Sequence, residues 1–223
     1  MKTKYILALS GNDIFSGGGL YADLATYSKH QLHGFVAVTC LTAMTDKGFE
    51  VFATDSTIFS QQLDSLKDVP FSGLKLGLLP NIEIAEIALD FVKKQKNIPI
   101  VLDPVLVCKE SHDVEVSALR EELLKFFPHV TIITPNLVEA ELLAQKSIQN
   151  LEDMKAVAKE LYDLGAQHVG IKGGNRFSQE LAVYVYYDGQ DFHILESPVL
   201  SQNNIGAGCT FASSIASQLL LGQ

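Results

Sequence analysis

The residues best suited to chemistry lie near the end of the chain, where two glycines and a cysteine precede an apolar segment. Gly206, Gly208 and Cys209 come directly before apolar residues that recur on one helical face: Phe211, Ala212, Ile215, Ala216, Leu219 and Leu220. A turn of small residues at a helix start leaves N–H groups free at the positive end of the helix dipole, which favours an anion site. A thiol placed there tends to have a lowered pKa. An ordinary glycine turn beside a buried cysteine explains the same spacing, so both interpretations stay open.

A second constellation combines an amide and a carboxylate at a predicted strand–helix junction. Asn136 and Glu139 are three residues apart and share a helix face. An Asn cap with Glu at the third helical position is a common helix start, so the spacing alone is explained by capping. Further along, Lys172-Gly173-Gly174-Asn175-Arg176 closes another predicted strand and offers positive charge.

A third glycine run, 11–19, follows the first predicted strand and enters the first predicted helix. The Gly-x-Gly-x-x-Gly spacing of dinucleotide-binding proteins is absent from it, and no acidic residue obviously ends the second strand. Asp23 lies on the expected buried side of the helix that follows. A half-buried carboxylate needs a partner, which a protonated ring nitrogen or exocyclic amine of a ligand would supply. An acid favoured by the helix dipole is the alternative interpretation.

The bulk properties indicate one globular domain over residues 1–223. The 223 residues are 47% hydrophobic and 19% charged, and the net charge of −9 argues against a nucleic-acid or anionic-membrane surface. Cys40, Cys108 and Cys209 are widely spaced and odd in number, so reduced thiols and a cytoplasmic location are expected. The apolar runs are too short to span a membrane.

Strand and helix patterns alternate along the chain and predict an α/β fold with a mostly parallel sheet covered on both faces. The expected strands are 5–9, 35–40, 74–79, 98–102, 130–134 and 169–172. The expected helices include 57–66, 84–92, 119–127 and 137–144, one with its face at Leu20, Leu24 and Tyr27, and one capped by Asn150. Residues 182–187 and 192–195, joined through Asp188-Gly189, predict a β-hairpin. Ligands bind such sheets beyond the carboxyl ends of the strands, which is where the polar motifs fall.

These motifs together resemble the ribokinase-like kinases, in the branch that phosphorylates vitamin B6 and the hydroxymethylpyrimidine of thiamin. Residues 1–221 match in order and spacing, and four motifs placed consistently are far more specific than any one. The resemblance implies a three-layer α/β/α fold with a mostly parallel central sheet and a β-hairpin. It also implies that Gly206, Ala207 and Gly208 hold the migrating phosphoryl group, and that Cys209 takes the substrate's hydroxyl proton.

The same resemblance implies ATP and Mg²⁺ as cofactors. Glu139 is expected to order the metal ion, with Asp103 as a second carboxylate, since Mg²⁺ usually takes only one or two. The expected nucleotide contacts are Asn136, Lys172, Gly173, Gly174, Asn175, Arg176 and Gly208. Relatives often carry an Asp that contacts the nucleotide near Tyr184, and this chain departs from them there.

The substrate pocket is expected to involve Gly11, Asp23, Met44 and Cys108. Pyrimidine kinases typically place Gln where Met44 stands, whereas B6 kinases carry Met. Cys108, in a segment that resembles the B6 kinases' lid, can add to the aldehyde of pyridoxal; a small apolar residue at a strand end is the alternative. Three departures concern the loop around Asn12, the pair Ile14-Phe15, and Ile205, where close B6 kinases often have His.

The expected activity is therefore ATP-dependent phosphorylation of the hydroxymethyl group of pyridoxal, pyridoxine and pyridoxamine. Hydroxymethylpyrimidine or phosphomethylpyrimidine phosphorylation is the alternative, and a non-catalytic vitamin-binding protein is a third. A homodimer is implied by the resemblance. Only 14 residues follow Cys209, where relatives continue for several tens, so we expect the C-terminal part of the family fold to be absent.

Overall fold

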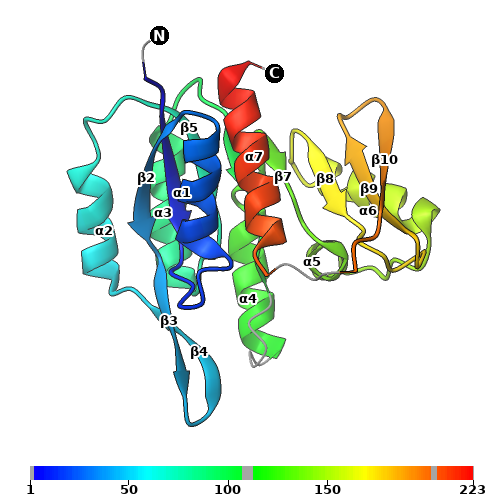
Figure 1. The fold of residues 1–223 in the computed structure, drawn as a ribbon, viewed down its shortest axis with the longest axis horizontal. Coiled ribbons are helices and arrows are strands. Elements are labelled where there is room, and N and C mark those ends of the chain that lie inside the picture. Colours follow the sequence, from blue (N-terminus) through cyan, green and yellow to red (C-terminus); the bar gives the residue numbers. More distant parts are fainter. Residues whose placement is uncertain (1–2, 107–112, 202–204, 223) are drawn as a thin grey trace.

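The computed structural model describes residues 3–106, 113–201 and 205–222, with only the backbone for 113–115. Within this part, eight strands form one sheet in the order β10-β9-β8-β7-β6-β5-β1-β2. The pairs from β2 across to β8 are parallel, and β9 and β10 are added antiparallel. Helices cover both faces of this sheet (Figure 1), so the expected three-layer α/β/α architecture with a mostly parallel sheet is confirmed.

The strands of the sheet are β1 (Tyr5–Ser10), β2 (His33–Val38), β5 (Phe71–Leu76), β6 (Ile100–Leu102), β7 (Ile132–Ile133), β8 (Val169–Lys172), β9 (Leu181–Tyr187) and β10 (Phe192–Pro198). The helices are α1 (Gly19–Lys29), α2 (Ser56–Ser65), α3 (Ile82–Lys94), α4 (Asp113–Leu124), α5 (Leu137–Ala144), α6 (Leu151–Asp163) and α7 (Ala207–Leu221). A short 3₁₀ turn, Phe127–His129, precedes β7. The predicted hairpin around Asp188-Gly189 is confirmed as β9 and β10.

Alternate side chains of β1 enter two different cores, one on each side of the sheet. Leu7 and Leu9 belong to the larger core, under the layer of α2 to α6. Ile6 and Ala8 belong to the smaller core, under α1 and α7. This alternation follows from the two-residue period of a strand and explains why β1 reads as a continuous apolar run.

Two further strands, β3 (Cys40–Thr45) and β4 (Gly48–Ala53), form a separate antiparallel hairpin that projects from the body (Figure 1). The sequence patterns do not predict this hairpin, because the residues from Phe35 to Cys40 predict one continuous strand. In the structure β2 ends at Val38, and a backbone bond from Thr54 N to Thr39 O closes the base of the hairpin.

The buried face of α1 matches the predicted one at Asp23 and Tyr27 but not at Leu24. Asp23, Thr26 and Tyr27 are buried, while Leu24 is 37% exposed. The helix is therefore rotated so that small and polar side chains meet α7, and the apolar Leu24 lies at the rim.

In the described part of the chain, none of the helices has the length and apolar character needed to cross a membrane.

Candidate active site

Two glycine turns meet at the carboxyl end of the sheet, one before α1 and one before α7. Gly206, the N-cap of α7, has φ +86°, a conformation that favours glycine. A Cβ atom on Gly206 would lie 1.6 Å from the carbonyl oxygen of Gly17, so the two turns touch through their backbones. No side chain fits between them, which explains the glycines on both sides.

Asp13 shapes the turn before α1. Its carboxylate accepts hydrogen bonds from the N–H groups of Phe15 (3.0 Å), Gly17 (3.1 Å) and Gly18 (2.8 Å). A Cβ on Gly18 would lie 3.6 Å both from this carboxylate and from the sulfur of Cys209. The loop thus brings Asp13 close to the thiol. Asp13 was not among the predicted site residues, although an Asp inside a glycine run is a turn signal.

Cys209 lies in the first turn of α7 and is partly buried. Burial raises the pKa of its thiol, and the charges of Asp103 and Asp23 act in the same direction. The charge of Lys75 and the N–H of Gly19, which donates to the sulfur, lower the pKa but do not prevail. The expectation of a lowered thiol pKa was therefore wrong, because desolvation outweighs the helix terminus.

The N–H groups of Ala207, Gly208 and Cys209 precede the first helical bond, from Thr210 N to Gly206 O (2.9 Å). Helix geometry leaves these donors without intrahelical acceptors. They share the positive end of the helix dipole, so this turn keeps the features of an anion site.

A buried ion pair lies beneath the same turn. The Lys172 ammonium contacts Asp103 at 2.7 Å, and Thr134 Oγ1 donates to the same carboxylate oxygen at 3.3 Å. A Cβ on Gly208 would lie 3.4 Å from the Lys172 nitrogen and 4.0 Å from Asp103 Oδ2. The glycine thus allows the α7 turn to approach a cation, which adds positive charge to the anion site.

Asn136 and Glu139 form a complete capping box at the start of α5. Asn136 Oδ1 accepts the Glu139 N–H at 2.9 Å, and Glu139 Oε2 accepts the Asn136 N–H at 2.8 Å. The capping interpretation is confirmed. Burial raises the pKa of Glu139 to about 7, helped by the charge of Asp103 and opposed by Lys172. The charges of the two buried carboxylates therefore repel each other.

The segment after β8 divides into a buried and an exposed part. A Cβ on Gly173 would lie 2.3 Å from Val183 O, whereas Gly174 (φ +57°) has open space around it. Asn175 is exposed. The Arg176 guanidinium pairs with Glu141 at 2.9 Å and donates to Ile148 O at 3.3 Å, which ties it to α5 and the following loop. Of the two cations considered, Lys172 is the one beside the α7 turn.

The carboxylate of Asp23 already has partners within the chain, which corrects the expectation that it contacts substrate. Its side chain is completely buried and contacts Lys75 Nζ at 3.0 and 3.1 Å. Ser213 Oγ donates to Asp23 Oδ1 at 2.5 Å. Lys75 and Ser213 were not among the predicted site residues. A lysine between Leu74 and Leu76 in an apolar strand was the available signal, since a buried lysine needs a partner.

The other expected substrate contacts differ in their exposure to solvent. Gly11 is buried, and a Cβ there would lie 2.4 Å from Cys40 Sγ. Met44 is 59% exposed on the β3–β4 hairpin, opposite Phe49, whose ring stacks on Phe15 of the β1–α1 loop. Cys108 lies outside the described residues.

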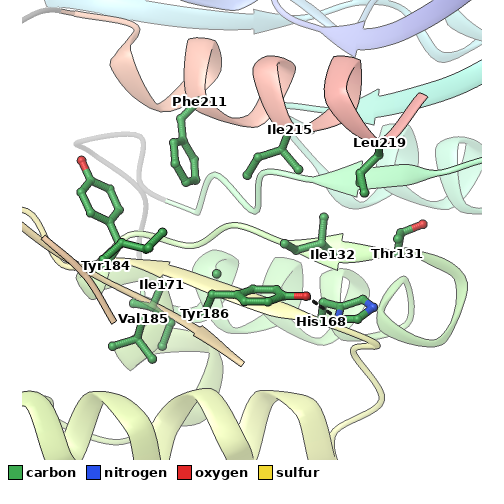
Figure 2. A pocket seen from close by; sticks show the side chains of 12 residues that line it. Thr131, Ile132, His168, Ile171, Tyr184, Val185, Tyr186, Phe211, Ile215 and Leu219 are labelled. Atoms are coloured by element: carbon green, nitrogen blue, oxygen red, sulfur yellow. Dashed lines mark hydrogen bonds between the residues drawn. The ribbon is translucent and has the colours of Figure 1, made fainter. Parts of the chain in front are cut away.

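A separate cavity of about 350 Å³ lies between α7 and the β7–β9 side of the sheet (Figure 2). Phe211, Ile215 and Leu219 line one wall, and Tyr184 stacks on Phe211 with ring centroids 5.7 Å apart. Tyr186 on the facing wall is hydrogen-bonded to a neighbouring histidine. Tyr184, near which a nucleotide contact was considered above, lines this cavity. Among the described residues, none of the others expected to contact substrate, nucleotide or metal does so.

The comparisons with known proteins agree with this geometry. A family model described as phosphomethylpyrimidine kinase matches residues 13–223. This chain belongs to that family. It is 36% identical to the pyridoxine kinase of Bacillus subtilis over 232 residues, covering 100% of this chain and 84% of the relative. It is 35% identical to the hydroxymethylpyrimidine/phosphomethylpyrimidine kinase of Aquifex aeolicus, covering 96% and 85%.

Among solved structures, the pyridoxal kinase of Staphylococcus aureus in complex with AMP-PCP superposes with a TM-score of 0.93 at 34% identity. The match covers 100% of this chain and 82% of that one. Both the expected family and the expected ribokinase-like fold are therefore confirmed.

Proposed function

We propose that this protein transfers the γ-phosphoryl group of ATP to the 5-hydroxymethyl group of vitamin B6. The observation that carries the proposal is the N-terminus of α7 at the carboxyl end of the sheet. The Cys209 thiol, three N–H groups without intrahelical acceptors and the Lys172 cation lie together there. The family supports the reaction class, and the relatives named pyridoxine and pyridoxal kinase support the substrate.

The chain's own groups supply the parts that phosphoryl transfer requires. The N–H groups of residues 207–209 hold the migrating phosphoryl oxygens, and Lys172 neutralises charge that develops beside Gly208. The thiolate of Cys209 takes the proton of the substrate hydroxyl. The hydroxyl oxygen then bonds the γ-phosphorus, and ADP leaves with the electron pair of the bridging bond.

Mg²⁺ fits the two buried carboxylates. Glu139 and Asp103 would hold the ion, and its positive charge would relieve the repulsion that helps raise the pKa of Glu139. Two carboxylates are the usual protein share of a magnesium site at phosphates. The described residues hold no cluster of three or more His, Cys, Asp or Glu suited to a metal. When bound, the ion supplies charge neutralisation at the ATP phosphates.

The expected nucleotide contacts at 172–176 have unequal support. The Lys172 ammonium group lies beside Gly208 of the α7 turn. Gly174 and Asn175 are exposed, which leaves room for a nucleotide. Arg176 is held by Glu141, so we assign it to organising the loop.

The choice between B6 and pyrimidine rests on Met44. A pyrimidine offers ring nitrogens and an amine, and a site built for them needs a donor–acceptor pair that Met lacks. The pairing of Met44 with Phe49 and the stack of Phe49 on Phe15 connect this hairpin to the β1–α1 loop, which supports a place at the pocket wall. Phosphorylation of hydroxymethylpyrimidine is the second candidate, because a kinase of that name is 35% identical.

The hairpin also supports a homodimer. Leu41, Met44, Phe49 and Phe52 are each 47–59% exposed and occupy both of its faces. A two-stranded hairpin is marginal in water by itself, so a second copy that covers these side chains would stabilise it.

The decisive experiment is a substrate panel. ADP formation is measured with pyridoxal, pyridoxine, pyridoxamine and hydroxymethylpyrimidine, each with and without Mg²⁺. We expect the B6 vitamers to be used better than the pyrimidine, and turnover to require the metal. Equal or better use of the pyrimidine would make the second candidate the function, and binding of vitamers without ADP formation would make the protein a binder.

Cys108 gives the panel a second arm. A Cys108→Ala variant should impair pyridoxal more than pyridoxine, because only pyridoxal carries an aldehyde to which a thiol can add. Equal losses for the two vitamers would remove Cys108 from substrate selection.

A further inference from the structure

A completely buried lysine lies directly below the active-site turn and is not used by the reaction as derived above. Lys75 is on β5, and its side chain and that of Asp23 are 0% exposed. Gly73 and Gly77, two residues before and after it, lie on the same face of the strand. A Cβ on Gly73 would lie 3.0 Å from Leu220 of α7, and one on Gly77 would lie 2.8 Å from the Lys75 nitrogen. The small residues thus make room for a buried charge beneath α7.

The pair joins three elements that are distant in sequence. Lys75 on β5 contacts Asp23 on α1, and Ser213 of α7 donates to the same carboxylate. Ser213 is one turn beyond Cys209, so the hydrogen bond fixes the face of α7 that carries the thiol. Ser217 continues this face by donating to Ser213 O at 2.7 Å.

The charges of the pair also act on the thiol itself. Burial alone lowers the pKa of Lys75, but the charges of Asp23 and neighbouring groups outweigh it, so the side chain is an ammonium ion. For Cys209 the effect of Lys75 is larger than the opposing effect of Asp23. The other groups that act on the thiol are Asp103 after β6 and the Gly19 N–H of α1. Asp13 of the β1–α1 loop lies beside Gly18, as does the sulfur, and Lys172 lies beside Gly208.

We propose that Lys75, Asp23 and Ser213 form a positioning network for Cys209: Ser213 anchors the head of α7 on the pair, and the ammonium group of Lys75 stabilises the thiolate. The inference rests on the role proposed above for Cys209. This role gives a reason for the buried ion pair. A buried ion pair by itself is weak support for stability, since neutral residues of similar volume often replace such pairs without loss of stability.

The first test measures the thiolate without using activity. The rate of Cys209 alkylation by iodoacetamide is followed against pH by peptide mass spectrometry, which separates it from the other cysteines. The double variant Lys75→Met/Asp23→Asn removes both charges of the pair, so neither partner is left buried without its counter-ion. We expect its alkylation midpoint to rise by about one pH unit, because the larger, favourable charge is lost. The matched control is Lys159→Met/Asp163→Asn, which removes an exposed ion pair on α6 and should leave the midpoint unchanged.

The second test remains available if the double variant does not fold. Ser213→Ala keeps both charges and removes one hydrogen bond. We expect kcat to fall on the order of fivefold at unchanged KM for pyridoxal, the factor that corresponds to one hydrogen bond, with recovery in Ser213→Thr.

An unchanged or lowered alkylation midpoint in the folded double variant would overturn the proposal, as would an unchanged kcat in Ser213→Ala. The turnover of Cys209→Ala tests the proposed function separately from the positioning network. If Cys209→Ala retained normal turnover, the role of the thiol as base would fail, while the alkylation experiment would still measure the influence of Lys75.

Discussion

At the scale of single residues, the sulfur of Cys209 is held between groups that favour its neutral form and groups that favour its charge. Burial and two aspartates act one way, and Lys75 and the Gly19 N–H act the other. A base with a raised pKa accepts a proton more readily once ionised, but fewer molecules are ionised near neutral pH. The two effects shape the predicted kinetics.

We expect Cys209→Ala to lower kcat by ~100-fold or more, the usual scale for the loss of a general base, while vitamer binding is largely kept. Steady-state ADP formation and calorimetric binding of pyridoxine measure the two quantities. A variant with near-normal kcat would exclude the thiol from the mechanism.

The pH dependence follows from the direction of the pKa shift. Because burial keeps the Cys209 thiol protonated, the thiolate fraction and kcat should increase with pH, by roughly tenfold per unit at most, from about pH 7 to about pH 9. Cys209→Ala serves as the control and should lose this rise. A wild-type profile that is flat over the same range contradicts the assignment.

Glu139 offers a way to separate the charge from the helix cap. Gln keeps an oxygen that accepts the Asn136 N–H, so Glu139→Gln should preserve the capping box. We expect it to raise the Mg²⁺ concentration for half-maximal activity by about tenfold or more, the scale for a perturbed metal site, and to slow transfer. Vitamer binding without ATP should barely change.

The comparison variant is Glu139→Ala, which removes charge and cap together and should also cost about 1 kcal/mol of stability. If Glu139→Gln kept the wild-type Mg²⁺ dependence, the residue would serve the helix alone.

At the scale of elements, α7 has two different long faces. Ala212, Ser213 and Ala216 are buried against α1 and the sheet, whereas Phe211 and Ile215 line the cavity of Figure 2. The close approach of the first face depends on small side chains and on the glycine contact at the head of the helix. That contact leads to a sharp prediction.

Gly206 and Gly222 bound the same helix with φ of +86° and +85°, but only Gly206 is crowded. Alanine at Gly222 should cost about 1–2 kcal/mol, the strain of a left-handed conformation. Alanine at Gly206 should cost about 3 kcal/mol or more, because its Cβ overlaps the Gly17 carbonyl and overpacking is added. Thermal and urea unfolding measure the difference. Equal losses would mean that the two turns do not touch in solution.

Local signals predicted some elements with their observed bounds. The Asn136–Glu139 pair and the run 169–172 placed α5 and β8, because a cap and an apolar strand are encoded by adjacent residues. The β3–β4 hairpin was not predicted, because Cys40 continues the apolar pattern of β2. The pairing of Cys40 with Ala53, which begins the hairpin, is not visible in that pattern.

The site could be predicted only in part for the same reason. The glycines and Cys209 stand together in sequence, so the α7 turn was found. The partners of Asp23 are 52 and 190 residues away, and no pattern along the chain connects them. Burial of the thiol likewise depends on contacts between α1 and α7 that the sequence does not display.

At the scale of the whole molecule, the β3–β4 hairpin projects from the body of the described chain and exposes apolar side chains on both of its faces. Leu41 and Phe52 lie directly opposite one another on it and are 56% and 47% exposed. Their apolar surface is what a second copy would bury.

We therefore expect sedimentation equilibrium to give about twice the chain mass of 24.4 kDa. The variant Leu41→Ser/Phe52→Ser should shift the mass towards that of one chain. Leu200→Ser, at a side chain 78% exposed in the loop after β10, is the control and should not. A wild-type protein that sediments as one chain would exclude the dimer.

The tie between Ser213 and Asp23 also governs the order of events during synthesis. The ribosome releases α1 and β5 long before α7, and the contact spans 190 residues. Until α7 emerges, no helix covers the Lys75–Asp23 pair on that side, and the smaller core is exposed to water. Contacts between such distant segments slow folding. The nascent chain thus carries most of its sheet while the candidate active site is still incomplete, and the emergence of α7 closes the small core and brings Cys209 to that site together.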